Sequence, residues 1–512
     1  MDINLEHDKV RFAKNVLAAR VPREETADVI VPDSLPDIAR IIDTDANVLV
    51  RGKDSENGRV TVSGIVSATV VYVPDGSETL RRVAVELPFE VAAAGTEVAQ
   101  ATRVVARVNL SSADAIVVNP RKISVRAELI ADITGYNDAE LALPVGFKDG
   151  AEPTESGTQL LKDTFSFHAA TDVREKTFSV TDEYAIPNTS PAAAELLRAN
   201  VTLTPDESKL VGNKLIFKGA ANVRALYARV DNNEPMETEF KLDFSQIMEL
   251  ENAAADDTFE LVPQLTGAYF DLGGENETGR VITAELHAVA QCVATGKKTV
   301  PFLTDAYSTR FELAPRRDFV SVEDNAPAGR FGAVLRANLV TPPGVARVVS
   351  VTARAGNVTN AYEDNTATLR CPVNVSAVYV NSDGQVQSAN GRFEAELNAN
   401  GANVNARAEC GGEVYAVAAE GGIEVRVPVE FTAHEVSRLE VSPISGLSYD
   451  EETPTDTKAL PSLVLARANE GETLWQLAKK HRSTTELIRE ANDMEENDAP
   501  ASGKFLVIPK KR

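Results

Sequence analysis

Three long stretches of the chain alternate apolar and other residues with a period of two. They cover residues 60–72, 215–227 and 367–379, and in each a small residue stands eight positions before a tyrosine. Successive side chains of a β-strand point to opposite faces, so each stretch predicts a strand with one buried apolar row. The first small residue precedes the second by 155 positions, and the second precedes the third by 152. Three such matches indicate a tandem repeat.

The remaining pattern of each copy also predicts β structure. Phe89 and Phe244 each lie 17 residues beyond their tyrosine, in a further strand pattern, and Phe393 is the counterpart in the shorter third copy. Turn-forming residues separate the two strand patterns, as in antiparallel hairpins. The small residue in each long strand predicts a bend or bulge. Each copy is therefore expected to form a β-sandwich or an open barrel.

Short helices are expected at three places. Residues 5–19 could form one of them. Two prolines, four positions apart, precede residues 37–42 and again residues 192–197, where proline fits a helix start and the apolar residues fall at helical spacing. In the third copy the motif is absent, and its nearest equivalent, around residues 325–327, is degenerate.

The charge of the chain is strongly acidic and unevenly distributed. There are 76 acidic and 52 basic residues, which gives a formal net charge of -24. This balance argues against nucleic-acid binding and against adsorption to anionic lipid. Residues 463–512 are nearly neutral, with nine basic and eight acidic residues, so the acidic excess belongs to the repeats and their linkers. No apolar run has the length of a signal peptide or a transmembrane helix, so a cytoplasmic location is expected.

No constellation of catalytic or metal-binding residues stands out. Cys292, Cys371 and Cys410 are too far apart for a disulfide framework or a metal-binding spacing. The five histidines have no carboxylate or cysteine at ligand spacing. We therefore expect no catalytic residue, no metal site and no cofactor, and the protein is predicted not to be an enzyme.

The last fifty residues follow another pattern, strand–helix–helix–strand. Strands are expected at 463–467 and 505–508, with helices beginning after Thr473 and after Thr484. The segments Gly471–Trp475, Ala491–Asn492 and Gly503–Pro509 resemble those of a LysM domain. Trp475 either forms a ligand platform or packs in the core beneath the first helix, and the second role is the more common. Departures from the LysM pattern are Glu472, Arg482, Pro500 and Lys504.

In LysM domains, the loop after the first strand and the loop before the second form a groove for polymers of N-acetylglucosamine. The resemblance implies that a groove in this chain would be formed by Gly471, Glu472, Thr473, Leu474, Asn492, Met494, Ser502 and Gly503. Pro500 and Lys504 lie in or beside the second loop, where the usual pattern has other residues.

Three β-rich repeats, an acidic tether and a C-terminal LysM domain together resemble the SipL-like group of spore-envelope morphogenesis proteins. The resemblance implies a non-enzymatic structural or adaptor protein on the mother-cell side of the forespore surface. Its partner would be a coat-scaffold ATPase, SpoIVA or a similar protein, bound partly through the LysM domain. The alternative is a cell-wall protein whose LysM domain binds peptidoglycan.

The expected fold is mainly β, with three tandem sandwich-like repeats and a small α+β LysM domain. The predicted boundaries are 1–137 for repeat 1 with an N-terminal helix, 138–163 for a linker, 164–315 for repeat 2, 316–447 for repeat 3, 448–462 for an acidic linker and 463–512 for the LysM domain.

Overall fold

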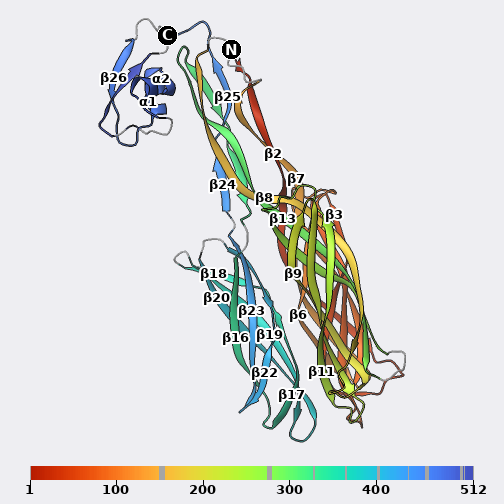
Figure 1. Ribbon diagram of the computed structural model, residues 1–512. Helices are drawn as coiled ribbons and strands as arrows, with labels where there is room; N and C mark the ends of the chain where they lie inside the picture. Colours follow the sequence, from red (N-terminus) through yellow and green to blue (C-terminus); the bar gives the residue numbers. More distant parts are fainter. Residues whose placement is uncertain are drawn as a thin grey trace.

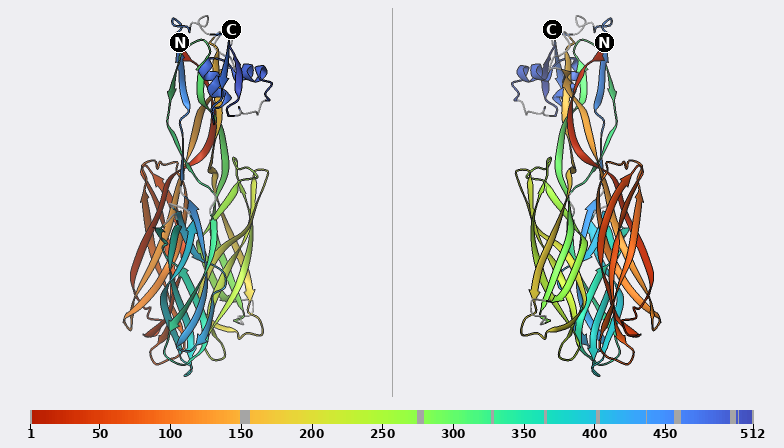
Figure 2. Two further views of the ribbon diagram at one scale, coloured as in Figure 1. Left: turned by 90° about the vertical axis from the view of Figure 1, so that its left-hand side faces the viewer. Right: turned by 90° about the vertical axis from the view of Figure 1, so that its right-hand side faces the viewer.

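The computed structural model has an elongated shape (Figure 1). It describes residues 2–148, 156–273, 279–326, 329–363, 366–400, 404–435, 437–455, 461–495, 500 and 502–510. A broad body built from three β-rich parts continues into a narrower stalk, and a small domain with both helices lies beside the stalk tip (Figure 2). The prediction of a mainly β fold is confirmed. Among the described residues, no helix is long and apolar enough to span a membrane.

Repeats 1 and 2 have the same order of six strands. In repeat 1 these are β2 (Leu5–Ile30), β3 (Ile38–Glu56), β4 (Arg59–Pro74), β5 (Arg81–Ala94), β6 (Arg103–Asn119) and β7 (Lys122–Phe147). In repeat 2 they are β8 (Thr158–Ala185), β9 (Ala193–Val211), β10 (Lys214–Arg229), β11 (Pro235–Glu249), β12 (Thr258–Gly273) and β13 (Val281–Ser308). The short β1 (Asp2–Ile3) precedes repeat 1 and pairs with β25 of repeat 3.

Repeat 3 keeps this order, but several of its strands are divided. They are β14 (Leu313–Arg317), β15 (Val320–Asp324), β16 (Gly329–Val340), β17 (Val345–Ala355), β18 (Thr359–Glu363), β19 (Thr366–Asn381), β20 (Val386–Asn400), β21 (Val404–Cys410), β22 (Tyr415–Ala419), β23 (Gly422–Glu435), β24 (Ser437–Val441) and β25 (Ile444–Tyr449). The final domain consists of β26 (Leu463–Arg467), α1 (Leu474–His481), α2 (Thr485–Ala491) and β27 (Phe505–Pro509).

Each repeat contributes two packed layers. One layer is an antiparallel meander, with the order β3-β4-β5 or β9-β10-β11, and in repeat 3 β17 and β18 share one side of β19 while β20 takes the other. The second layer is built on the paired first and last long strands of the repeat, which are β2 with β7, β8 with β13, or β16 with β23, and we call each of these a long strand pair. The first two long strand pairs join in one six-stranded sheet of order β12-β13-β8-β2-β7-β6. This arrangement confirms the predicted sandwich-like repeats.

The three predicted long strands are the central strands β4, β10 and β19. The tyrosines that end their apolar rows, Tyr72, Tyr227 and Tyr379, are 0, 0 and 3 % exposed. Tyr72 Oη donates a hydrogen bond to Pro36 O at 3.1 Å, and Tyr227 Oη donates one to Pro191 O at 3.2 Å. The proline motif of the first two repeats therefore forms a turn that the buried tyrosine holds against the strand.

The expected irregularity beside the small residue is present in the first two repeats. Gly64 lies opposite Phe89 and Gly219 lies opposite Phe244 in the neighbouring strands. A Cβ atom on either glycine would lie 2.6 Å from the phenylalanine ring, and the register of the adjoining strand shifts next to it. The 17-residue spacing noted in the sequence thus marks a cross-strand pair in which the ring covers a glycine.

The three expected helices are wrong, because residues 5–19 belong to β2, residues 38–42 to the start of β3, and residues 193–197 to the start of β9. The cause is a set of β-bulges. In β3 the register shifts between Ile38 and Arg40 and again between Ile41 and Asp43. Each extra residue turns period two into a local spacing of three or four, which imitates a helix.

The outer ends of the long strand pairs form the stalk, which consists of three antiparallel ribbons. These pair residues 5–12 with 139–147, residues 158–169 with 296–308, and β14 and β15 with β25 and β24. The short β1 adds a third strand to one of them, beside β25. Apolar side chains from all three ribbons share one core, which includes Phe167, Phe302 and Leu439. The expected linker at 138–163 is corrected accordingly, because β7 continues to Phe147 and β8 begins at Thr158. Residues 149–155 of that linker lie outside the described residues.

The three repeats pack around a common axis through equivalent bulges. In each repeat, the register between the central strand and its neighbour skips one residue beside the buried tyrosine. The skipped residues are Ile42, Leu197 and Val349. They keep the repeat offsets of 155 and 152 positions. All three join one apolar cluster, together with Leu226 and Val378. The bulge in each repeat therefore directs an apolar side chain to the axis.

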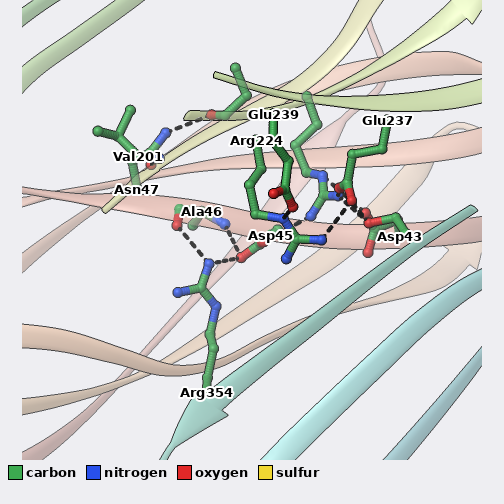
Figure 3. Close-up of polar contacts among 12 residues, drawn as sticks. Asp43, Asp45, Ala46, Asn47, Val201, Arg224, Glu237, Glu239 and Arg354 are labelled. Carbon is green, nitrogen blue, oxygen red and sulfur yellow. Dashed lines mark hydrogen bonds and ion pairs between the residues drawn. The ribbon is translucent and has the colours of Figure 1, made fainter. Parts of the chain in front are cut away.

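A buried ionic cluster lies beside this apolar contact (Figure 3). The residues after the three bulges are Asp43, Arg198 and Ser350, one from each repeat. Arg198 is 2 % exposed, and its guanidinium lies 3.2 Å from Asp43, 2.9 Å from Asp45, 3.3 Å from Glu237 and 3.0 Å from Ser350 Oγ. A buried charge is tolerated only when it is paired in this way.

The cluster is completed by two further guanidinium groups. Arg354 of repeat 3 bonds to Asp45, and Arg224 lies 2.5 Å from Glu237. Burial acts to raise the pKa of Asp45, but Arg354 and Arg198 outweigh it and hold that pKa below its usual value. Burial also opposes the charge of Arg198, but the surrounding carboxylates raise its pKa. Both groups therefore remain ionised, and the cluster ties together all three repeats.

Amide side chains close the edges of strands between repeats. Asn47 Nδ2 donates to Ala199 O at 2.9 Å and its Oδ1 accepts from Val201 N at 3.0 Å, so repeat 1 covers the edge of β9. Gln291 of repeat 2 makes the same pair of bonds, both 2.8 Å, with the N–H and C=O of Ala106 in β6. Unpaired strand edges favour aggregation, and these amides occupy part of each edge.

We predict that Tyr227→Ala lowers the free energy of unfolding by about 3–5 kcal/mol, because it leaves a cavity in a fully buried site. Tyr269→Ala is the control, because that ring is 55 % exposed. Urea denaturation of both variants tests the prediction. Equal stability of the two variants would contradict the burial of Tyr227.

Candidate functional site

The C-terminal domain is a two-stranded sheet with both helices on one face. β26 and β27 pair antiparallel, with Leu463 opposite Pro509 and Arg467 opposite Phe505. The small core between sheet and helices contains Leu474, Leu477, Ala478, Ile488, Leu506 and Ile508. The predicted strand–helix–helix–strand order is confirmed.

Residues of the first predicted groove loop stabilise the domain itself. Thr473 caps α1 by accepting a hydrogen bond from Gln476 N at 3.2 Å, and Gln476 Oε1 accepts one from Thr473 N at 2.8 Å. Glu472 accepts hydrogen bonds from the backbone and side chain of Asn469, both at 3.0 Å. Gly471 has a φ of +76°, which glycine adopts without strain. Gly471 and Thr473 are exposed, so a ligand could still reach this loop.

Two predicted groove residues contribute instead to the interior. Leu474 is 5 % exposed and Met494 is partly buried against the same core. Asn492 joins α2 to β27, because its Nδ2 donates to Ile488 O and Val507 O, both at 2.7 Å, and its Oδ1 accepts from Val507 N at 2.8 Å. These three residues therefore hold the fold together.

The second loop is described only in part. Residues 496–499 and 501 lie outside the described residues. Ser502 is exposed, and Gly503 has a φ of +80° with its N–H bonded to Ala468 O at 2.9 Å. The structure thus brings the two predicted loops together through the contact of Gly503 with Ala468, which precedes the first loop.

The outer face of the β26–β27 sheet is a surface that sequence reasoning missed. Leu463, Leu465 and Phe505 are 56, 61 and 59 % exposed. Both helices cover the other face of this sheet, so none of the described residues of the domain covers these side chains. The signal was present in the sequence, because 463–466 is apolar at four successive positions. A two-stranded sheet with helices on one face must expose half of such a run. We call these three residues the sheet-face patch.

The domain also contacts the stalk tip through α1. Asp305 in β13 accepts hydrogen bonds from Trp475 Nε1 at 2.8 Å and from Lys479 Nζ at 2.7 Å. Tyr307 Oη donates to Ser483 O at 2.8 Å, and its ring meets the Trp475 ring edge-on with centroids 4.8 Å apart. Trp475 therefore packs partly in the domain core and partly against the stalk.

The contacts of Arg482 explain why this chain departs from the LysM pattern at that position. It ends α1 with a φ of +53°, a backbone conformation that favours glycine. Its guanidinium bonds to Phe311 O at 3.2 Å, to Thr455 Oγ1 at 2.7 Å and to Glu312 at 2.6 Å. The side chain at this position thus makes contacts with the stalk that glycine could not make.

A cleft of about 810 Å³ between repeats 1 and 3 is the other candidate site. Its lining residues include Arg23, Ser111, Glu128, Asn357, Arg392, Phe393 and Glu394. Glu128 lies 3.5 Å from Arg126 and Glu394 lies 3.8 Å from Arg370, so both carboxylates have cationic partners. The described residues that line the cleft include no histidine or cysteine.

Two separate segments of the chain match known family models, one in repeat 2 and one in the C-terminal domain. Residues 193–272, which span β9 to most of β12 in repeat 2, match the family model described as SipL, SPOCS domain. Residues 467–509 match the LysM domain model. The chain thus carries a SipL SPOCS domain and a C-terminal LysM domain, which confirms the predicted resemblance. No curated protein and no solved structure matches the chain.

We predict that Asn492→Ala lowers the stability of the LysM domain by about 1–3 kcal/mol, because it leaves polar groups of β27 without partners. Ser502→Ala, at an exposed turn, is the control and should change stability by less than about 0.5 kcal/mol. The emission of Trp475 during urea denaturation reports both values. The prediction fails if the two variants unfold at the same urea concentration.

Proposed function

We propose that the protein is a non-enzymatic adaptor of spore-envelope assembly whose LysM domain binds a protein partner. The partner would be a coat-scaffold ATPase similar to SpoIVA, on the mother-cell side of the forespore surface. The matches to the SipL SPOCS and LysM families support a binding role connected with sporulation. The acidic charge of the remaining chain argues against nucleic acid as the partner.

The sheet-face patch is the observation that carries the proposal. Leu463 and Leu465 lie two positions apart on β26, and Phe505 lies on β27 diagonally across from Leu465, so two aliphatic side chains and one aromatic ring run along the solvent face of the paired strands. Grouped apolar residues of this kind mark protein–protein contacts, and aromatic residues are enriched there. A glycan groove, in contrast, would use the loops at the end of the domain. The patch therefore favours a protein surface over a glycan.

The basic residues near this patch indicate the charge of the partner surface. Arg467 lies on the same strand as Leu465 and directly opposite Phe505. Lys504 and Lys510 flank β27 on either side, and both are close to the patch in sequence. A partner with an apolar centre and an acidic rim would complement this arrangement.

We predict that Leu465→Asp and Phe505→Asp each weaken binding to the scaffold ATPase by at least about tenfold, as substitutions at central interface residues do. Val211→Asp is the control, because this side chain is 54 % exposed but belongs to repeat 2. Affinities would be measured by biolayer interferometry with the full chain. Affinities of the two LysM variants equal to that of the control would contradict the assignment of the patch.

Deletion of residues 463–512 tests whether the LysM domain or the repeats bind the scaffold ATPase. The proposal expects the shortened chain to lose most of its affinity for the scaffold ATPase. If the shortened chain bound as tightly as the full chain, the repeats would carry recognition, and the LysM assignment would be wrong.

Peptidoglycan is the second candidate ligand, because the LysM match and the exposed Gly471, Thr473 and Ser502 favour it. We predict that the full chain does not sediment with purified peptidoglycan. Retention of most of the protein on the pelleted cell walls would favour the glycan function. Loss of that retention in Thr473→Arg, with Leu465→Asp unaffected, would place the glycan in the groove between the loops.

A further inference from the structure

The stalk tip offers three equivalent positions to the LysM domain, and only one is equipped to hold it. In each ribbon of the stalk the strand register skips one residue near the tip. The residues directly after the skipped ones are Gly146 in β7, Asp305 in β13 and Gly446 in β25. Two positions further along the chain stand Lys148, Tyr307 and Ser448. Only repeat 2 therefore presents a carboxylate together with an aromatic ring.

Both of these residues contact the LysM domain directly. Each oxygen of Asp305 accepts a hydrogen bond from Lys479 Nζ, at 2.7 and 2.8 Å, and one oxygen also accepts from Trp475 Nε1. Partial burial acts to raise the pKa of Asp305, but these hydrogen bonds outweigh it and hold the pKa below its usual value. Arg317 of repeat 3 adds a second cationic group at 3.8 Å. The carboxylate is thus ionised and aimed at α1.

The strength of this contact suits reversible docking. Lys479 is 45 % exposed and Glu312, which pairs with Arg482, is 85 % exposed, so their ion pairs contribute little in water. The Tyr307–Trp475 contact and the hydrogen bond from Trp475 to Asp305 are less exposed and supply most of the attraction. Polar contacts between domains of one chain resemble transient protein–protein contacts, so relative motion of the two domains is expected.

We propose that Asp305 and Tyr307 form a latch whose occupant is the chain's own LysM domain. In the closed state α1 faces the stalk, while the sheet-face patch and the exposed residues of both loops remain open to solvent. A partner that requires Trp475 or Lys479 must first displace the stalk. A partner that binds the sheet-face patch meets a LysM domain held in a fixed orientation at the stalk tip. The latch does not depend on the identity of that partner.

Trp475 is the single tryptophan of the chain and lies in the latch, so its fluorescence reports the state directly. The test compares Asp305→Ala with Asp163→Ala, a control for an exposed stalk carboxylate on β8, in the full-length protein. Loss of the hydrogen bonds to a charged acceptor should raise the ratio of open to closed molecules roughly tenfold. Emission should shift to the red, acrylamide should quench it more strongly, and small-angle X-ray scattering should record a larger maximum dimension.

Unfolding of the LysM domain must be distinguished from opening of the latch. Hydrogen exchange of β26 and β27, which do not contact Asp305, should be unchanged in Asp305→Ala. The charge reversals Asp305→Lys and Lys479→Asp should each open the latch, and the double variant should move the emission back toward that of the original protein. The proposal is overturned if Asp305→Ala behaves like the control. It is also overturned if red-shifted emission comes with lost protection of β26 and β27, because Asp305 would then support the LysM fold itself.

Discussion

The arrangement of the body depends on Arg198, a guanidinium that has almost no contact with water. Its partners come from three repeats: Asp43 and Asp45 from repeat 1, Glu237 from its own repeat, and Ser350 from repeat 3. An ion pair of this kind adds little net stability, but removal of one partner leaves charges buried without compensation. The cluster therefore specifies which repeats meet at the axis and in which register. The packing of the repeats also brings the three ribbons of the stalk together, because the ribbons are the outer ends of the long strand pairs.

The sequence predicted the long strands, the repeat and the LysM domain, because each depends on a local pattern. It failed for the short helices, because bulges near Ile41 and beside Asn15 change the spacing of apolar residues locally. The axis could have been found by aligning the three copies at their offsets. That alignment places aspartate, arginine and serine at one equivalent position, which is an unusual substitution pattern for a residue that only packs.

The LysM surroundings were less predictable. Trp475 and Asp305 are 170 residues apart in sequence, and no local pattern connects them. Leu474 was assigned to the groove by resemblance, but its place at the first position of α1 directs it into the core. The sheet-face patch is the opposite case. Its residues were counted as ordinary strand residues, and they are exposed only because both helices lie on the other side of the sheet. A function in protein binding therefore rests on which face of the sheet remains uncovered.

The Arg198 cluster holds the three repeats together as one body. Hydrogen exchange of the full-length Arg198→Met variant tests this role, with Lys209→Met, an exposed substitution on the same strand, as the control. Protection should fall in β3, β9 and β17 together, because each of these strands supplies a residue at the axis. Loss of protection confined to repeat 2 would show instead that the repeats are independent units.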